Sequence, residues 1–210
     1  MRAMDGARPY RDVTVLDLVS AEAYLLSDPD EHQLHPPPAV LANLEHLRVS
    51  VLQPVQEQIR ARMTILGGYR SLLLNAKLHE PPWSQHRLGE AADCRLPASF
   101  LTSAKAAPIR DIVNRETVRL VGRPVSRGVN ASYYLFAWLC IYLPCFPIDE
   151  VVHEGGAGPG RPAWVHVSAT RGANRAAMAV TGRYVPGRRR SLTLSAALSL
   201  GAQRPSSIAG

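Results

Sequence analysis

The sequence is poor in cysteine and has no long run of apolar residues. It contains 3 Cys among 210 residues, at positions 94, 140 and 145, and no two of them form a Cys-x-x-Cys pair. An odd number without such a pair excludes a disulfide framework and a four-cysteine zinc site. We therefore expect buried, reduced thiols.

The absence of a charged residue over one stretch raises the question of a membrane span. Residues 129–148 carry no charge, but they include Asn130, Ser132 and two prolines, and acidic residues follow directly. This pattern predicts a buried core helix that ends near Pro144, with no transmembrane span. The first 25 residues contain acidic residues where a secretory peptide needs an apolar run, which predicts no signal peptide and a cytoplasmic location on synthesis.

Acidic residues and lysine are missing from the last forty residues. Residues 171–210 contain seven of the 24 basic residues and none of the 17 acidic ones, so residues 1–170 have 17 of each. The net charge of +7 therefore belongs to the C-terminal tail. A specific nucleic-acid partner is not expected from a charge confined to a tail, although such a tail would attract anionic envelope polymers.

Composition and breakers predict one domain with two extensions. Hydrophobic residues make up 46% of the chain and charged residues 20%, which excludes disorder of the whole chain. Proline clusters before position 39 and Arg-rich sequence near the C-terminus mark the predicted limits of the main domain. We expect a partly ordered leader over 1–37, a main domain over 38–182 and a basic tail over 183–210 that is disordered or weakly helical.

Apolar spacing predicts an α+β fold for the main domain. Proline at position 54 is expected to kink or split the first helix. The predicted helices cover residues 39–62, 71–78, 103–116 and 133–142. The predicted strands cover residues 63–66, 89–96, 150–153 and 164–168.

A histidine, an aspartate and a second histidine stand out as candidate metal ligands. His86 and Asp93 flank a tight turn at Gly89, and His166 lies on a later strand in Trp-Val-His-Val-Ser. Two imidazoles and one carboxylate can supply three ligands to Zn²⁺ and leave a fourth position open, as in catalytic zinc sites. From spacing alone, Asp93 could instead be a strand-end carboxylate paired with an arginine.

The order of several short motifs resembles a known family. Gly-Tyr-Arg-Ser at 68–71, Leu-Asn at 74–75, Ser-x-His-x-x-Gly-x-Ala-x-Asp at 84–93 and Trp-Val-His-Val-Ser at 164–168 are similar to motifs of the zinc D-Ala-D-Ala carboxypeptidases. These belong with the LAS and hedgehog-like metallopeptidases, and the match to their phage-type branch runs from about Pro38 to Val180, including Asn174-Arg175. The resemblance implies a small antiparallel sheet that carries a zinc site and is flanked by helices.

The resemblance also implies roles for individual residues. His86, Asp93 and His166 would bind one Zn²⁺ per chain. Arg70 would steady the substrate and the oxyanion, which a fixed guanidinium can do. Ser84 would bind substrate or make a hydrogen bond behind the metal ligands. Trp164 would line the substrate cleft, or it would belong to the core.

The role of general base has three candidates. Many members place a glutamate three residues before the last histidine ligand, where this chain has Ala163. The segment 148–154 is similar to one in the phage-associated branch that ends in an acidic residue, which makes Glu154 the candidate base. Glu150 and His153 compete with it, and Glu154 could simply end the strand. Strand alternation places Glu150 and Glu154 on one face and His153 on the other.

The function implied by the resemblance is hydrolysis of peptidoglycan stem peptides by metal-activated water. The chain would act as a D-Ala-D-Ala carboxypeptidase or a related endopeptidase at the cell wall, and the expected absence of a signal peptide suits a phage-encoded lysis or virion protein. The alternative is a catalytically weak, zinc-containing module that binds peptidoglycan, for which the missing Glu-x-x-His pattern is the main support.

Overall fold

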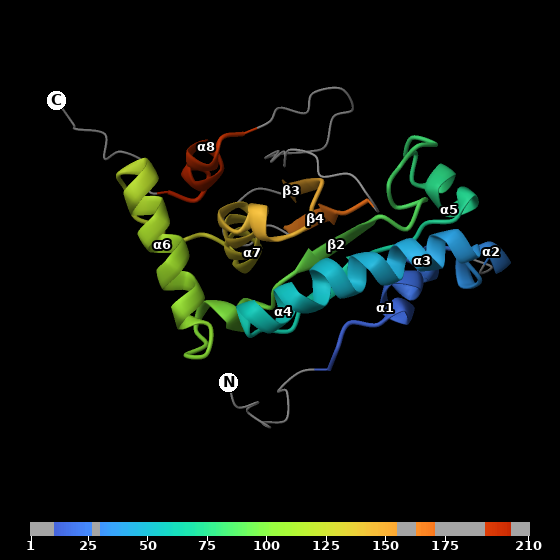
Figure 1. The fold of residues 1–210 in the computed structure, drawn as a ribbon, viewed down its shortest axis with the longest axis horizontal. Coiled ribbons are helices and arrows are strands. Elements are labelled where there is room, and N and C mark those ends of the chain that lie inside the picture. The colour runs from blue at the N-terminus through green and yellow to red at the C-terminus, as the bar shows by residue number, and fades with distance from the viewer. Residues whose placement is uncertain (1–10, 27–29, 155–162, 171–191, 203–210) are drawn as a thin grey trace.

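The computed structural model describes residues 11–26, 30–154, 163–170 and 192–202, and it has the predicted α+β architecture (Figure 1). A small antiparallel sheet is flanked by helices. The strands are β1 (Thr64–Gly67), β2 (Ala91–Arg95), β3 (Glu150–Glu154) and β4 (Trp164–Ser168). The helices are α1 (Val15–Ser20), α2 (Glu31–Leu34), α3 (Pro38–Leu47), α4 (Gln53–Ile59), α5 (Leu72–Lys77), α6 (Ala107–Val121), α7 (Ala131–Ile141) and α8 (Leu194–Ser199).

The four strands lie in the order β1-β2-β4-β3, with every neighbouring pair antiparallel. Asp93 on β2 and Val152 on β3 both lie opposite His166 on β4. Residues directly opposite each other in an antiparallel pair share a face of the sheet. The register therefore gives one face, which we call the site face, to Asp93, Val152 and His166 together with Glu150 and Glu154.

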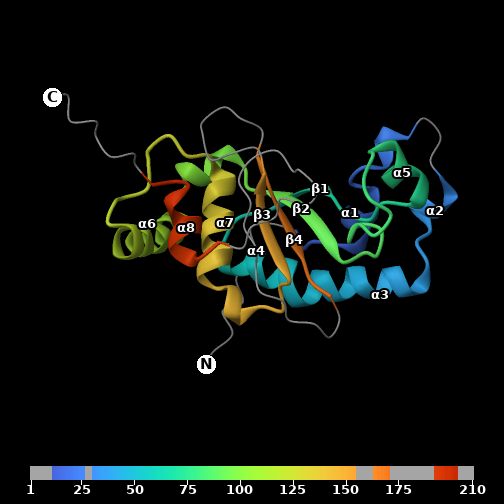
Figure 2. The same cartoon turned by 90° about the horizontal axis from the view of Figure 1, so that it is seen from above.

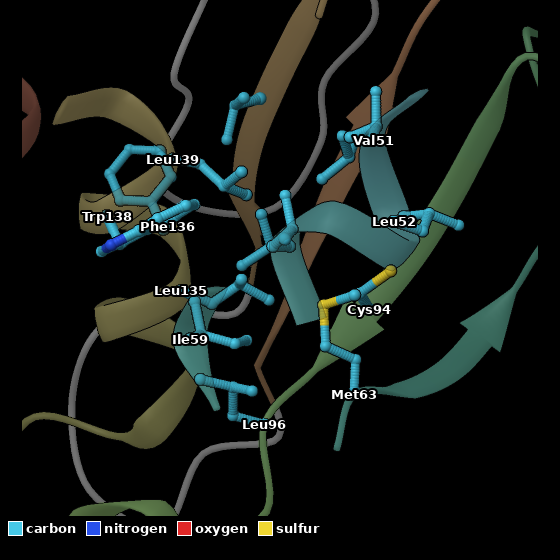
Figure 3. Packing of buried hydrophobic residues seen from close by; sticks show 14 of the residues in the cluster. Val51, Leu52, Ile59, Met63, Cys94, Leu96, Leu135, Phe136, Trp138 and Leu139 are labelled. Carbon is cyan, nitrogen blue, oxygen red and sulfur yellow. The ribbon is translucent and has the colours of Figure 1, made fainter. Parts of the chain in front are cut away.

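The other face of the sheet, here called the core face, packs under helices. Side chains such as Cys94 and Val165 meet α7, whose Leu135 and Leu139 are fully buried. Val51 and Ile59, from the helical run that begins with α3, complete this core (Figure 3). Figure 2 shows α7 beside β3, with α8 and α6 beyond it.

The first long helix is split, as the proline at position 54 predicted. A five-residue π-helical segment, Arg48–Leu52, lies between α3 and α4, and the amide of Gln53 donates to the carbonyl of Arg48 five residues earlier. Pro54 has no amide hydrogen for the usual bond, and a local π turn is a recognised way to absorb such a break.

The charge-free segment 129–148 contains α7, which begins where the side chain of Asn130 accepts a hydrogen bond from the amide of Tyr133. The helix is eleven residues long, and nearly all of it is buried against the sheet. Within the described ranges, no helix is long and apolar enough to cross a membrane.

The part of the predicted leader that the structure describes is built into the domain. A capping box at Thr14 and Asp17 begins α1, and Leu18 and Val19 are buried. The buried Gln33 donates from its amide to the carbonyls of Val19 and Tyr69. Residues 11–26 and 30–37 therefore add core and hydrogen bonds to a domain that the sequence analysis began at Pro38.

One part of the predicted tail also packs on the domain. Helix α8 lies against α6 and α7, Leu198 is fully buried, and its carbonyl accepts a hydrogen bond of 2.8 Å from the hydroxyl of Tyr133. Within residues 192–202, the short helix α8 is therefore stabilised by its contacts with α6 and α7. The arginines of the tail and the Gly/Pro-rich loop at 155–162 lie outside the described residues.

Candidate metal centre

The structure brings the three predicted metal ligands together in one buried cluster. One ligand atom each from His86, Asp93 and His166 lie within 4.8 Å of one another, a group that could hold a metal ion. The exposed fractions of the three residues are 4%, 8% and 9%. They come from the loop after α5 and from the adjacent strands β2 and β4, where Asp93 and His166 are 73 positions apart in sequence.

The pairwise contacts within this cluster are short, and the two histidines approach different oxygens of Asp93. Nε2 of His86 lies 3.3 Å from Nδ1 of His166 and 3.5 Å from Oδ2 of Asp93, and Nδ1 of His166 lies 3.0 Å from Oδ1 of Asp93. Two ligands about 2.0–2.1 Å from one zinc ion and at a tetrahedral angle would be about 3.3 Å apart. The pairwise distances are of this order, and the three side chains together form a group that could hold a metal ion.

The backbone fixes which nitrogen of His86 faces the cluster. Its Nδ1 lies 2.7 Å from the carbonyl oxygen of Gly68, which can only accept a hydrogen bond. Nδ1 therefore carries the hydrogen, and the lone pair of Nε2 points toward Asp93 and His166. A carbonyl behind a ligating histidine is the usual way to set its tautomer and orientation.

Local sequence explains how the loop holds His86 in place. The side-chain amide of Asn75 donates to the carbonyls of Glu80 and Pro81, each at 3.0 Å. Gly89 then turns the chain into β2 with a φ of 72°, where a Cβ atom would also lie 2.7 Å from the carbonyl oxygen of Val40. Glycine is needed at this turn both for its left-handed backbone and for the lack of space.

The electrostatics of the cluster favour a bound cation. Burial opposes ionisation of Asp93, but His86 and His166, when they are protonated, outweigh burial through their charge and hydrogen bonds and hold the pKa of its carboxyl well below the usual value. Burial likewise lowers the pKa of His166, but the hydrogen bond to Asp93 and the negative charges nearby outweigh it and raise that pKa. Asp93 is therefore a carboxylate at neutral pH, ready to bind a cation.

Arg70 lies behind this carboxylate, in a buried network that the sequence analysis only partly foresaw. Its Nη2 is 3.1 Å from Oδ2 of Asp93, so the alternative of an Asp–Arg pair is realised within the same cluster. Its Nε and Nη2 also donate to the two carboxylate oxygens of Glu22 at 2.7 and 2.9 Å. Burial opposes the charge of Arg70, but Glu22 and then Asp93 raise its pKa.

The three candidates for the general base lie on the two faces of the sheet that strand alternation predicted. Glu154, at the end of β3, is half-buried on the site face, and burial followed by the charge of Asp93 raises its pKa. Glu150 is buried on the same face. His153 lies on the core face, with its ring 5.4 Å from that of Phe136, and burial lowers its pKa to about 4. His153 is therefore turned away from the cluster.

The two other residues singled out by sequence lie at the edges of the cluster. Ser84 is in the turn two residues before His86 and is half-buried, and its carbonyl accepts a hydrogen bond from the amide of Arg87. Trp164 is half-buried at the start of β4, opposite Glu154 in the register and therefore on the site face. No family model and no curated protein matches the chain.

Proposed function

We propose that the protein is a zinc-dependent peptidase that hydrolyses peptidoglycan stem peptides. The observation that carries the proposal is the convergence of ligand atoms from His86, Asp93 and His166 within 4.8 Å of one another, in a group that could hold a metal ion. A donor set of two imidazoles and one carboxylate, with a position left open, is typical of catalytic zinc. A zinc ion held by these residues would supply Lewis-acid activation of water and of the peptide carbonyl.

Glu154 is the group that moves protons in this proposal. It ends β3 on the site face, and the electrostatic influence of both Asp93 and His166 reaches its carboxyl. Its raised pKa makes it a stronger base than an exposed carboxylate. Glu154 accepts a proton from the attacking water and then delivers one to the nitrogen of the departing amine.

Arg70 supplies positive charge beside the cluster. Its Nε and Nη2 are held by Glu22 and Asp93, and Nη1 makes no hydrogen bond to the described part of the chain. In the proposal, Nη1 faces the substrate and offsets negative charge on the carbonyl oxygen as it forms. Ser84 and Trp164 flank the peptide from the loop and from β4.

The substrate class rests on the order of the sequence motifs, which is similar to that of the D-Ala-D-Ala carboxypeptidases. The placement of these motifs supports the transfer, because Gly68 and Arg70 of the first segment contact His86 and Asp93 of the second. The partner is then a peptide of the cell wall, where the protein would act. The arginines of residues 171–210 would add a salt-sensitive attraction to anionic envelope polymers.

A zinc-containing peptidoglycan-binding module with weak catalysis is the second candidate. Position 163, three residues before His166, is a buried alanine, so the acid that many members of the resembled family place there is missing. Such a module would bind the ion and the peptide but would turn over poorly.

The decisive experiment combines metal analysis with digestion of purified peptidoglycan. We expect about one zinc per chain, with release of D-alanine for a carboxypeptidase or of new amino groups for an endopeptidase. The variant Glu154→Gln should keep its zinc and lose activity by about 10²–10⁴-fold, the usual contribution of a general base. The matched variant Glu150→Gln, on the same strand and face, should keep most of its activity.

Each alternative result has a definite meaning. A protein that takes up no zinc when zinc is supplied would exclude both candidate functions. Zinc binding without hydrolysis in the wild type would favour the binding module. Full activity of Glu154→Gln would reject Glu154 as the base, and a selective loss in Glu150→Gln would move that role to Glu150.

A further inference from the structure

The N-terminal segment contributes a carboxylate to the network behind the candidate metal ligands. Glu22 is 8% exposed and makes two hydrogen bonds to Arg70, at 2.7 and 2.9 Å. The same Nη2 of Arg70 that bonds to Glu22 also bonds to Oδ2 of Asp93. Glu22, Arg70 and Asp93 therefore form one continuous chain of charged hydrogen bonds that ends at a metal ligand.

The surrounding backbone is built to bring the N-terminal segment to this place. The amide of Tyr69 donates to the carbonyl of Leu18 at 2.8 Å, and the amide of Ser71 donates to the side chain of Gln33 at 2.8 Å. Residues on both sides of Arg70 are thus tied to the segment that carries Glu22. The contact is a fixed part of the fold.

Gly67 shows how closely the three charged groups are packed. A Cβ atom at this position would lie 2.8 Å from Oδ2 of Asp93, 3.0 Å from Oε2 of Glu22 and 3.2 Å from Nη2 of Arg70. Any side chain at residue 67 would push into the network, so the glycine leaves the space in which the three groups meet.

Charge explains why the cluster needs Glu22. Without Glu22, the buried guanidinium of Arg70 would depend on Asp93 for its counter-charge, and it would compete with a dication for the same carboxylate. With Glu22 present, the Glu22–Arg70 pair is neutral, and the negative charge of Asp93 remains available to the ion. Groups that hold a ligating carboxylate usually change metal affinity when they are removed.

We propose that Glu22 is a positioning residue of the metal centre that acts through Arg70. By holding Arg70 it orients the carboxylate of Asp93, and by neutralising Arg70 it leaves the charge of that carboxylate available to the ion. The N-terminal segment is then a component of the site. This inference rests on the proposed zinc binding, and it assigns to Glu22 the neutralisation of Arg70. Glu22 itself does not touch the ion or the substrate.

The test is the affinity of the full chain for Zn²⁺, measured by competition with a chromophoric chelator, with the absorption spectrum of bound Co²⁺ as a second readout. Glu22→Gln should raise the zinc dissociation constant by about 10–100-fold and change the cobalt spectrum. The matched control Asp17→Asn removes another carboxylate of the same segment, which pairs with Arg11. It should leave both readouts unchanged.

A double variant separates action through Arg70 from a direct effect of charge. Glu22→Gln combined with Arg70→Gln removes both members of the neutral pair, and it should bind zinc more tightly than Glu22→Gln alone. Equal weakness of the double variant would overturn the route through Arg70, and wild-type zinc affinity in Glu22→Gln would overturn the inference altogether.

The inference and the proposed function fail in different ways. Absence of zinc from the wild type would end the proposed function, whereas normal zinc affinity in Glu22→Gln would end only the role of Glu22. If Glu22→Gln does not fold, Glu22→Asp keeps the charge and withdraws the carboxylate by one methylene. This variant should bind zinc more weakly than the wild type, and unchanged affinity would reject the positioning role.

Discussion

Two buried histidines on neighbouring strands occupy opposite faces of the sheet and have opposite electrostatic character. His166 on the site face lies 3.0 Å from the carboxylate of Asp93, and its pKa is raised. His153 on the core face makes no hydrogen bond to the described residues, packs against Phe136, and has its pKa lowered to about 4. Burial penalises the charge of both imidazoles, so the carboxylate partner is what distinguishes them.

This comparison shows why one buried histidine belongs to the candidate metal site and the other does not. The core face keeps His153 neutral by surrounding it with apolar groups, and among the described residues His153 belongs to no group of side chains that could hold a metal ion. The site face gathers Asp93, Glu150 and Glu154 around His166, so that positive charge is stabilised there. A dication is the ligand that such an arrangement favours.

The largest expected effect separates the two histidines by metal binding. His166→Ala removes one of three candidate ligands and should weaken zinc binding by more than the roughly 100-fold that loss of a supporting group can cost. His153 is also a buried histidine of the sheet but lies on the core face, so His153→Leu should retain one zinc per chain. Elemental analysis after dialysis against a chelator would show this difference, and loss of zinc from His153→Leu would contradict the assignment of faces.

The second expected effect is a pH dependence that belongs to His153. Burial lowers its pKa to about 4 in the folded protein, from the ordinary histidine value of about 6.5 that applies to the unfolded chain. The stability it contributes is therefore fully present above pH 6.5 and is lost as the pH falls toward 4, because the unfolded state then binds a proton that the folded state does not. At pH 5 this amounts to about 2 kcal/mol.

Urea unfolding of the zinc-free protein at pH 7 and pH 5 measures this contribution. His153→Leu should lose about 2 kcal/mol less stability than the wild type between the two pH values. The exposed His32, changed to Gln, serves as a control for removal of one histidine. An undiminished acid sensitivity in His153→Leu would mean that the imidazole is protonated inside the folded protein.

The metal ligands could be predicted from sequence because they stand in motifs that resemble those of a known family, although His166 lies 73 residues after Asp93. A turn at Gly89 separates His86 from Asp93 by one loop and the start of one strand, and the alternation of β4 fixes the face of His166. The structure confirms that the sheet is antiparallel and that the three residues converge. The role of Glu154 and the nature of the substrate stay predictions.

Glu22 could not be found in this way, because its partner lies 48 residues further along the chain. Proline and aspartate breakers at 27–30 and 36–38 suggested that the preceding residues form a loose leader. The largely apolar run from Val13 to Leu18 hints that this segment packs, but no periodic pattern indicates an ion pair over such a distance. The same limit applies to α8, whose six residues are held by α6 and α7.

The smallest expected effect compares adjacent residues of β4 that face opposite sides of the sheet. Val167 is buried on the core face, and Ser168 is fully buried on the site face with no hydrogen-bond partner for its hydroxyl in the described part of the chain. Val167→Ala should cost about 2 kcal/mol through lost apolar burial and the cavity left behind. Ser168→Ala removes an unpaired buried hydroxyl and should leave stability unchanged or raise it by up to about 1 kcal/mol. Urea unfolding of both zinc-free variants at pH 7 tests the pair. A loss in Ser168→Ala as large as that in Val167→Ala would show that the site face is held together by polar contacts as strongly as the core face is by packing.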